Sequence, residues 1–293
     1  KHLYLHEKLA YYSKHIDLFE FLVDKQFTKN SYDLLDEGII NKLTGSTLVY
    51  PITVPAESIK ILYIKKQAIS HQLLDIEIYN TKDSTQALIN KNFFSNSIIA
   101  CLFALALYNL MLFCFNKLSE FAYYSLYLFN SSAGLFYMYG AISHNALLYG
   151  EKVYWLNITA FLVSLFLVLF VREVFQIHKS SKKINILLNI NYLLVTTGVF
   201  IAVFIDLSLA IDLLGGIFGF SFITLFYMAL YLYKKKHPLV KIFMIAYLAY
   251  ILGMSVTLLM LMGYLPYHFM AMHASGVGIL VEALLFSYLL NFR

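Results

Sequence analysis

The chain has 293 residues, of which 60% are hydrophobic and 13% are charged, and its mean hydropathy is +0.69. These values exclude an ordinary soluble globular protein, because so few charged residues leave too much apolar surface for water to accept. The net charge of +5 arises entirely after residue 92, among apolar stretches. It therefore indicates membrane topology and no nucleic-acid partner.

Residues 1–92 have the composition of a soluble segment. They hold 11 acidic and 11 basic side chains, and Gly and Pro interrupt them repeatedly. Three runs fit strands, at residues 48–54, 59–64 and 74–79, the last with apolar and polar residues in alternation. We predict an extracytoplasmic β-sandwich domain over 1–92. Because few strands in about 90 residues are marginal for an independent β-domain, we expect it to be N-terminally truncated in this sequence.

The first 25 residues fit two different patterns. A helical stripe and a strand at residues 16–23 are both compatible with the spacing of the apolar side chains. The stripe consists of Leu5, Leu9, Tyr12, Ile16, Phe19 and Val23. Periodicity leaves both interpretations open.

Residues 93–293 contain seven stretches long enough to cross a membrane. A bilayer core about 30 Å thick requires about 20 apolar residues per helix. We predict spans at 93–115, 119–140, 154–174, 184–205, 208–233, 238–262 and 268–291. The predicted fold class is an α-helical membrane protein, a seven-transmembrane helix bundle over 93–293 preceded by a partial all-β domain.

The basic residues between the spans predict the orientation of the chain. The connections after the odd-numbered spans, with the C-terminus, hold ten Lys and Arg residues, whereas the connections after the even-numbered spans hold Lys152 alone. Positive residues resist translocation and stay in the cytoplasm. We therefore expect the N-terminal domain outside and Arg293 in the cytoplasm.

Glu282 is the first candidate for a functional side chain within the spans. Ionisable residues at membrane depth are costly and commonly functional. Glu282 follows Gly276 and Gly278, which would allow a neighbouring helix to approach closely. We interpret Glu282 as a signal-coupling residue; the alternative is a structural carboxyl group, protonated and hydrogen-bonded to a neighbour.

Three further coupling candidates are Asn109, Arg172 and Glu173. Arg172 and Glu173 end the third span, where charged side chains reach water, so a solvated helix end is the competing interpretation. Asn109 in the first span can hydrogen-bond across helices, as can three polar residues of the second span. Those three are Asn130, Ser131 and Ser132.

Metal and catalytic sites are not expected. His144, His268 and His273 lie near the predicted outer face, but the spacing of five between the last two favours interfacial histidines over a metal site. Residues 268–291 hold no Lys for a retinal Schiff base, and no zinc-protease, P-loop or dinucleotide-binding motif occurs. We expect no catalytic residue, no cofactor and no enzymatic activity in this chain.

Short motifs carry a resemblance to a known family. Residues 106–113, 120–127, 170–175 and 278–290, the last with Glu282, resemble spans one, two, three and seven of bacterial seven-transmembrane receptors with diverse intracellular signalling modules. Residues 49–57 and 61–64 resemble the end of the family's extracellular domain, a jelly-roll similar to carbohydrate-binding modules. The resemblance favours a strand at 16–23.

The resemblance implies a sensory receptor in the bacterial inner membrane. The outer β-domain would bind a small molecule or carbohydrate, and the helices would relay the change to a module in cis after Arg293, such as a histidine kinase or diguanylate cyclase. Membrane lipid is a further partner, and a homodimer is compatible with this organisation. The alternative is a transporter or lipid-handling membrane protein, which the absence of proline from the span centres and the odd number of spans disfavour.

Overall fold

The computed structural model describes residues 2–22, 27–33, 43–69, 73–146 and 149–291. The chain forms two compact units. Unit 1 consists of Lys1–Ser97, Phe136–Trp155 and Leu258–Met272, and unit 2 consists of Ile98–Leu135, Leu156–Thr257 and His273–Arg293.

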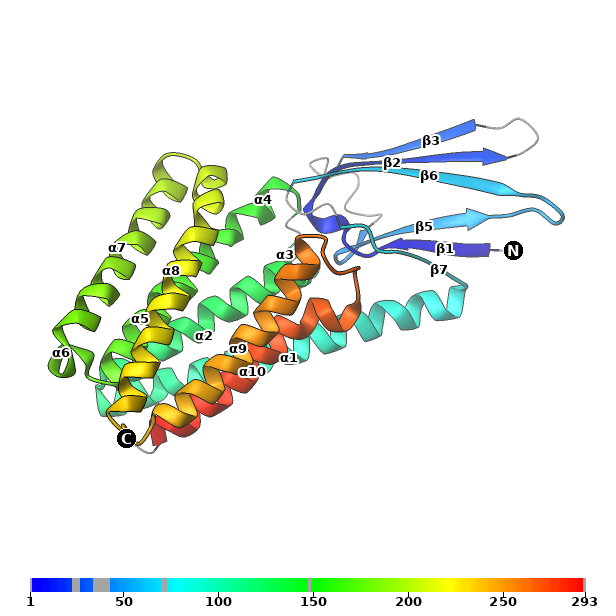
Figure 1. The fold of residues 1–293 in the computed structure, drawn as a ribbon. Helices are drawn as coiled ribbons and strands as arrows, with labels where there is room; N and C mark the ends of the chain where they lie inside the picture. The colour runs from blue at the N-terminus through cyan, green and yellow to red at the C-terminus, as the bar shows by residue number, and fades with distance from the viewer. Residues whose placement is uncertain (1, 23–26, 34–42, 70–72, 147–148, 292–293) are drawn as a thin grey trace. The chain divides into compact units, whose positions relative to one another are not determined.

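The β-strands of unit 1 form two antiparallel sheets that lie as two layers (Figure 1). One sheet has the strand order β4-β5-β1-β7, with bounds Leu43–Thr44, Thr47–Thr53, His2–Glu7 and Ile76–Tyr79. The other has the order β3-β2-β6, with bounds Phe27–Asp33, Ser13–Leu22 and Lys60–Ala68. A 3-10 helix, η1 (Ala10–Tyr12), connects β1 to β2.

The core of unit 1 follows from the alternation of side chains along the strands. In β2, Ile16 and Leu18 are fully buried, whereas Phe21 is exposed, because neighbouring residues point to opposite faces of a sheet. Leu5 of β1 and Leu48 of β5 are buried as well. The apolar residues of two sheets thus supply one core.

The predicted strands at 48–54, 59–64 and 74–79 correspond to β5, β6 and β7. The helical interpretation of the first 25 residues is wrong, because this segment contains β1 and β2. The β2 strand pairs on one side with β3, the next strand along the chain, and on the other with β6, which is distant in sequence. Local periodicity could not distinguish this arrangement from a helix.

In the part of the chain that the structure describes, seven long helices follow the strands (Figure 1). They are α1 (Thr81–Asn116), α2 (Ser119–Met138), α5 (Ile158–Val174), α7 (Lys182–Phe204), α8 (Leu207–Lys234), α9 (Val240–Leu261) and α10 (Phe269–Asn291). Short helices connect them: α3 (Ala141–Ala146), α4 (Glu151–Tyr154), η3 (Trp155–Asn157) and α6 (Ile177–Ser180). Each long helix overlaps one predicted span.

Six helices of the described chain are long and apolar enough to cross a membrane. The exception among the seven long helices is α2, which carries Glu120 and many Tyr and Ser residues in its 20 residues. At about 1.5 Å per residue it is still long enough for a bilayer core. The all-β segment followed by membrane helices agrees with the predicted fold class.

The helix that contains the first predicted span begins before it. Helix α1 begins at Thr81, so the predicted boundary between residues 92 and 93 falls inside it. Asn80 caps this helix, because its Oδ1 accepts a hydrogen bond from the backbone N–H of Asp83 at 2.9 Å. The first turns of α1 are polar, so hydropathy alone did not detect them.

Candidate functional site

In unit 1, Tyr11 of η1 connects the sheets to the segment that follows α2. Its hydroxyl donates a hydrogen bond to the Met138 carbonyl at 2.6 Å, and its carbonyl accepts one from the Gly150 N–H at 2.9 Å. At Gly140, where φ is +69°, an added Cβ would lie 2.8 Å from the Tyr11 ring. Only glycine combines this backbone conformation with so close an approach.

Hydrogen bonds from Tyr149 and from Lys91 also reach the turn between β4 and β5. The Tyr149 hydroxyl donates to the Gly45 carbonyl at 3.0 Å. Lys91 of α1 donates to Ser46 Oγ at 2.8 Å and to Thr47 Oγ1 at 3.1 Å, and also to the Lys8 carbonyl. We use the name "junction" for Tyr11, Gly140, Tyr149, Lys91 and residues 45–47, which join the sheets to α1 and to the connection between α2 and α5.

A buried ion pair lies in the same unit. Lys66 Nζ of β6 is 3.0 Å from Glu7 Oε1 of β1, with side chains only 6% and 1% exposed. Lys66 also donates to the Leu9 and Leu73 carbonyls, each at 3.0 Å. Burial raises the pKa of Glu7 and lowers the pKa of Lys66, and the attraction between the two charges opposes both shifts. With Glu7 and the two carbonyls, all three N–H donors of the Lys66 ammonium group have an acceptor.

Asp75, which precedes β7 of the β4-β5-β1-β7 sheet, contacts the segment before α10. Its pKa is raised by burial and lowered in part by Lys8, whose Nζ lies 3.6 Å away, and by a hydrogen bond with Tyr267. The pKa of Tyr267 is raised, mainly by burial and then by the charge of Asp75. Helix α1, the segment after α2 and the segment before α10 thus all contact the sheets within unit 1.

The outer face of the β3-β2-β6 sheet carries an exposed aromatic surface. Phe19 and Phe21 of β2 lie opposite Tyr63 and Ile61 of β6 and line an open hollow of about 550 Å³. Tyr63 is 59% exposed, and its ring meets that of Phe21 edge to face. Lys29 lies 5.5 Å from the centre of the Phe19 ring. We call the four residues Phe19, Phe21, Ile61 and Tyr63 the "aromatic surface".

In unit 2, Glu282 is fully buried in α10 and contacts α2. The Tyr127 hydroxyl donates a hydrogen bond to Glu282 Oε2, and the Tyr124 hydroxyl donates to the Ala283 carbonyl at 2.6 Å. Glu282 Oε1 has no hydrogen-bond partner among the described residues. Helix α2 therefore holds α10 through two tyrosines at the position that the sequence identified.

Aromatic rings from four helices surround this pair. Tyr124 stacks on Phe170 of α5 with centroids 4.8 Å apart, and Phe170 contacts Phe286 of α10 at 5.3 Å. Phe286 stacks on Phe243 of α9 at 5.7 Å. Such packing is dense and apolar, so a charge at Glu282 would be poorly solvated.

Helices α9 and α10 approach each other at two glycines. A Cβ added to Gly253 would lie 2.4 Å from the Ala274 carbonyl oxygen, and one added to Gly278 would lie 2.8 Å from that of Ala249. The Ser275 N–H donates to Thr257 Oγ1 at 3.0 Å nearby. This close approach, one turn from Glu282, was anticipated for Gly278 from the small residues around it.

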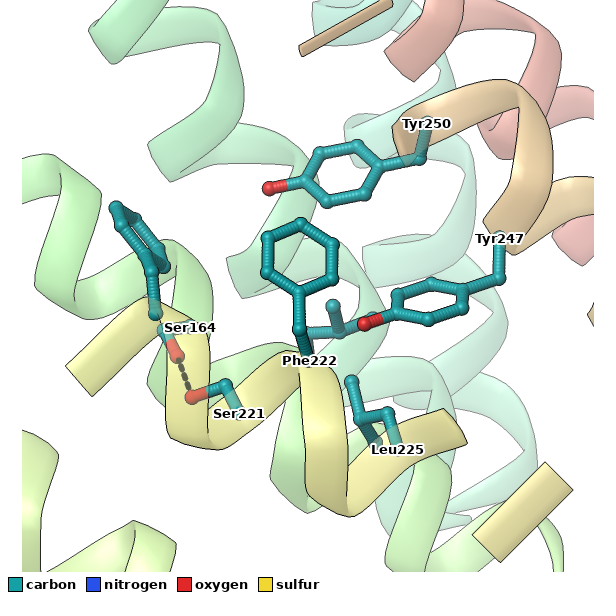
Figure 2. A pocket seen from close by; sticks show the side chains of 8 residues that line it. Ser164, Ser221, Phe222, Leu225, Tyr247 and Tyr250 are labelled. Atoms are coloured by element: carbon teal, nitrogen blue, oxygen red, sulfur yellow. Dashed lines mark hydrogen bonds between the residues drawn. The ribbon is translucent and has the colours of Figure 1, made fainter. Parts of the chain in front are cut away.

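A small cavity lies between α5, α8 and α9 (Figure 2). Tyr247 and Tyr250 reach towards Phe222, and Ser164 Oγ lies 3.1 Å from Ser221 Oγ. The Asn191 amide of α7 donates to Ser221 Oγ at 2.9 Å. The cavity measures about 20 Å³, enough for about one water molecule and too small for an organic ligand.

The remaining predicted residues are placed as follows. Asn109 is buried, but its amide donates to the Leu105 carbonyl of its own helix at 2.8 Å. The hydrogen bond between α2 and α1 comes instead from Ser125, whose Oγ donates to the Ala106 carbonyl at 2.8 Å. In α2, Asn130 and Ser132 likewise bond to carbonyls of their own helix.

Arg172 and Glu173 lie at the end of α5, away from the contacts of Glu282. Arg172 Nη1 donates to Asn189 Oδ1 of α7 at 3.1 Å. Glu173 makes no side-chain hydrogen bond or ion pair with the described residues. The structure therefore does not bring the four coupling candidates together at one site.

The outer histidines differ in their surroundings. His268 is exposed and its Nδ1 accepts from the Met270 N–H at the start of α10, whereas His273 is buried. The side chain of His144 lies outside the described residues. In the described part of the chain, no group of three or more His, Cys, Asp or Glu residues could hold a metal ion.

Residues 91–293 match a family model described as 7TM diverse intracellular signalling. No curated protein and no solved structure matches the chain.

Proposed function

The chain belongs to the 7TM diverse intracellular signalling family, and we propose from this premise that it is a sensory receptor whose outer β-sheets bind a ligand. It is a multi-pass membrane protein with a receptor-type role in signalling. In the proposal, ligand binding changes the packing of α10 on α2 and α9, and this change acts on a signalling module in cis on the cytoplasmic side. The chain itself would relay the signal and would catalyse no reaction.

The observation that carries the proposal is the junction. Tyr11, Tyr149 and Lys91 attach the sheets to the end of α2, to the connection between α2 and α5, and to α1 itself. A change in the β4-β5 turn or in η1 therefore moves helix ends, because these contacts are short and the residues are largely buried. A flexible linker would not transmit such a change.

The aromatic surface is the proposed ligand site. Exposed apolar patches commonly mark binding surfaces, and aromatic rings can pack against the C–H faces of a sugar while polar neighbours bind its hydroxyls. Lys29 supplies such a neighbour. The proposed ligand class is a carbohydrate.

A glycan-binding assay tests this site. The full chain in nanodiscs is screened on a glycan array, and the strongest glycan is titrated by calorimetry. We expect Phe21→Ala and Tyr63→Ala to weaken binding at least about tenfold. Ile78→Ala, an exposed apolar residue of the other sheet, is the matched control. Equal affinities for all three variants would reject the site.

The proposed orientation places the sheets outside and residue 293 in the cytoplasm of a bacterial inner membrane. The ten basic residues of the odd-numbered connections support it. Single cysteines introduced at Lys65 and at Lys235 would be labelled with an impermeant thiol reagent in intact spheroplasts of the chain lacking its two native cysteines. Labelling at residue 65 alone is expected; labelling at residue 235 alone would reverse the orientation.

A longer gene product tests the cytoplasmic module. The family description, diverse intracellular signalling, supports an output domain in cis. A kinase or cyclase attached on the cytoplasmic side should change its activity when the outer surface is occupied. Flux of a solute through proteoliposomes, with no such output, would favour the transporter alternative.

A further inference from the structure

Glu282 is a carboxyl group without a balancing cation in its described surroundings. Its side chain is fully buried, Oε2 accepts from the Tyr127 hydroxyl, and Oε1 has no partner. No ion pair to Glu282 is formed by the described residues, in contrast to the Lys66–Glu7 pair of unit 1. A buried carboxylate in this position would thus have a single hydrogen bond and no counter-charge.

The groups that face Glu282 are all neutral at physiological pH. They are Tyr124 and Tyr127 from α2 and, within electrostatic reach, Tyr247 and Tyr250 from α9. Helix α5 contributes Phe170 to the surrounding ring cluster, and α10 itself contributes Phe286. None of these side chains can offset a negative charge.

Two states of the carboxyl group must therefore be compared. An ionised carboxylate would remain uncompensated in an apolar environment, which costs far more than leaving one oxygen of a neutral carboxyl group without a partner. The neutral form also keeps the contact with Tyr127. The neutral form is therefore the more stable one in this conformation.

We propose that Glu282 is a proton-binding site of the helix bundle, occupied in the conformation described here and emptied when α10 separates from α2. Separation would break the contacts of Tyr127 and Tyr124 and admit water. The O–H bond of the carboxyl group would then break, the proton would pass to water, and the carboxylate would be solvated. The proton site itself requires no ligand, whereas its use in switching rests on the proposed receptor function.

The consequence is a pH-dependent equilibrium. Because the packed state holds one proton more than the open state, raising the pH favours the open state, and lowering it favours the packed state. A proton would thus act as an antagonist of any ligand that opens the bundle. Linkage requires the converse as well: an opening ligand must release the proton.

Infrared spectroscopy tests the site directly. The full chain in nanodiscs at neutral pH should show the C=O band of a neutral carboxyl group, and Glu282→Gln should remove it. Glu173→Gln, a carboxyl group at the end of the same bundle, should leave the band unchanged. Tyr127→Phe should shift the band to higher frequency, because a hydrogen bond is lost, and this shift needs no change at Glu282 itself.

Thermal unfolding at several pH values provides the second measurement. The wild-type Tm should fall between about pH 5 and about pH 8, and Glu282→Gln should fall less steeply, since it lacks the proton that the packed state retains. Equal slopes, or a wild-type spectrum without a band that Glu282→Gln removes, would overturn the proposal. A band abolished by Na⁺ at constant pH would also overturn it, because the site would then bind a metal cation.

Discussion

Both units bury a carboxyl group, but its surroundings differ: Glu7 of unit 1 is paired with a cation, whereas among the described residues Glu282 of unit 2 is not. Lys66 gives its three N–H donors to Glu7 and two backbone carbonyls, whereas Glu282 meets one tyrosine hydroxyl and aromatic rings. A carboxylate paired with a cation stabilises one arrangement, whereas a single carboxyl group without a counter-charge can change its protonation state with its surroundings. In the proposed function, unit 1 therefore provides the stable attachment and unit 2 the element that switches.

The largest effect on stability is expected for the ion pair of unit 1. Lys66→Ala leaves Glu7 buried without a cation and should lower the free energy of unfolding by about 3–5 kcal/mol. The measurement is denaturant unfolding of the chain in nanodiscs, followed by tyrosine fluorescence. Lys65→Ala removes the neighbouring lysine, which is exposed, and should change stability by no more than about 0.5 kcal/mol. Equal effects of the two substitutions would refute the role of the pair.

The next effect concerns the approach of α9 to α10. Gly253→Ala places a methyl group against the Ala274 carbonyl and should cost about 1–3 kcal/mol by forcing the helices apart. Gly216→Ala is the control, since nothing lies within 4 Å of its added Cβ. Thermal unfolding of both variants decides: if Gly253→Ala is as stable as Gly216→Ala, the two helices are less closely packed than described.

A smaller effect is expected at the hydrogen bond between α2 and α10. Tyr127→Phe removes the only donor to Glu282 among the described residues, and should cost about 0.6–1.7 kcal/mol, as for other hydrogen bonds between membrane helices. Tyr108→Phe alters a half-exposed tyrosine of α1 and should have no effect. A stability loss shared by both variants would point to general effects of removing a hydroxyl group.

The smallest expected effect is a change in the pKa of Asp17 in the β3-β2-β6 sheet. Asp17 accepts hydrogen bonds from Ser31 Oγ at 2.6 Å and from His15, with Lys29 at 3.3 Å, and these lower its pKa to about 2. The stability that they contribute is present above the unfolded pKa of about 3.9 and is lost as the pH falls towards 2. Ser31→Ala should raise the pKa of Asp17, observed by NMR of ¹³C-labelled Asp; an unchanged pKa would contradict the assignment.

The sequence was sufficient for the fold class and for singling out Glu282 as a carboxyl group among apolar residues, because both follow from apolar composition. Ionisable residues in a span are conspicuous, so Glu282 could be identified without a structure. Its partner Tyr127 lies 155 positions away in the chain, and nothing distinguishes it locally from the other tyrosines of α2. Long-range pairing of this kind is not encoded in local periodicity.

The junction and the ion pair were missed for a related reason. Lys65 and Lys66 are adjacent in β6, and which of them faces the core depends on the register with β2. Residues 1–25 were ambiguous because short apolar runs fit both periods. The early start of α1 could have been detected from Asn80 and Asp83, a capping pattern that precedes the apolar residues.

The central claim is that the junction and Glu282 are coupled, and hydrogen exchange of α10 tests it most directly. Tyr11→Phe removes the hydroxyl that bonds to Met138 and leaves unit 2 unaltered in sequence. Coupling predicts faster exchange of the α10 amides around Glu282 in Tyr11→Phe than in the wild type. When Tyr11→Phe is combined with Glu282→Gln, the increase in exchange rate over Glu282→Gln alone should be smaller. Identical exchange of α10 in the wild type and in Tyr11→Phe would contradict the account.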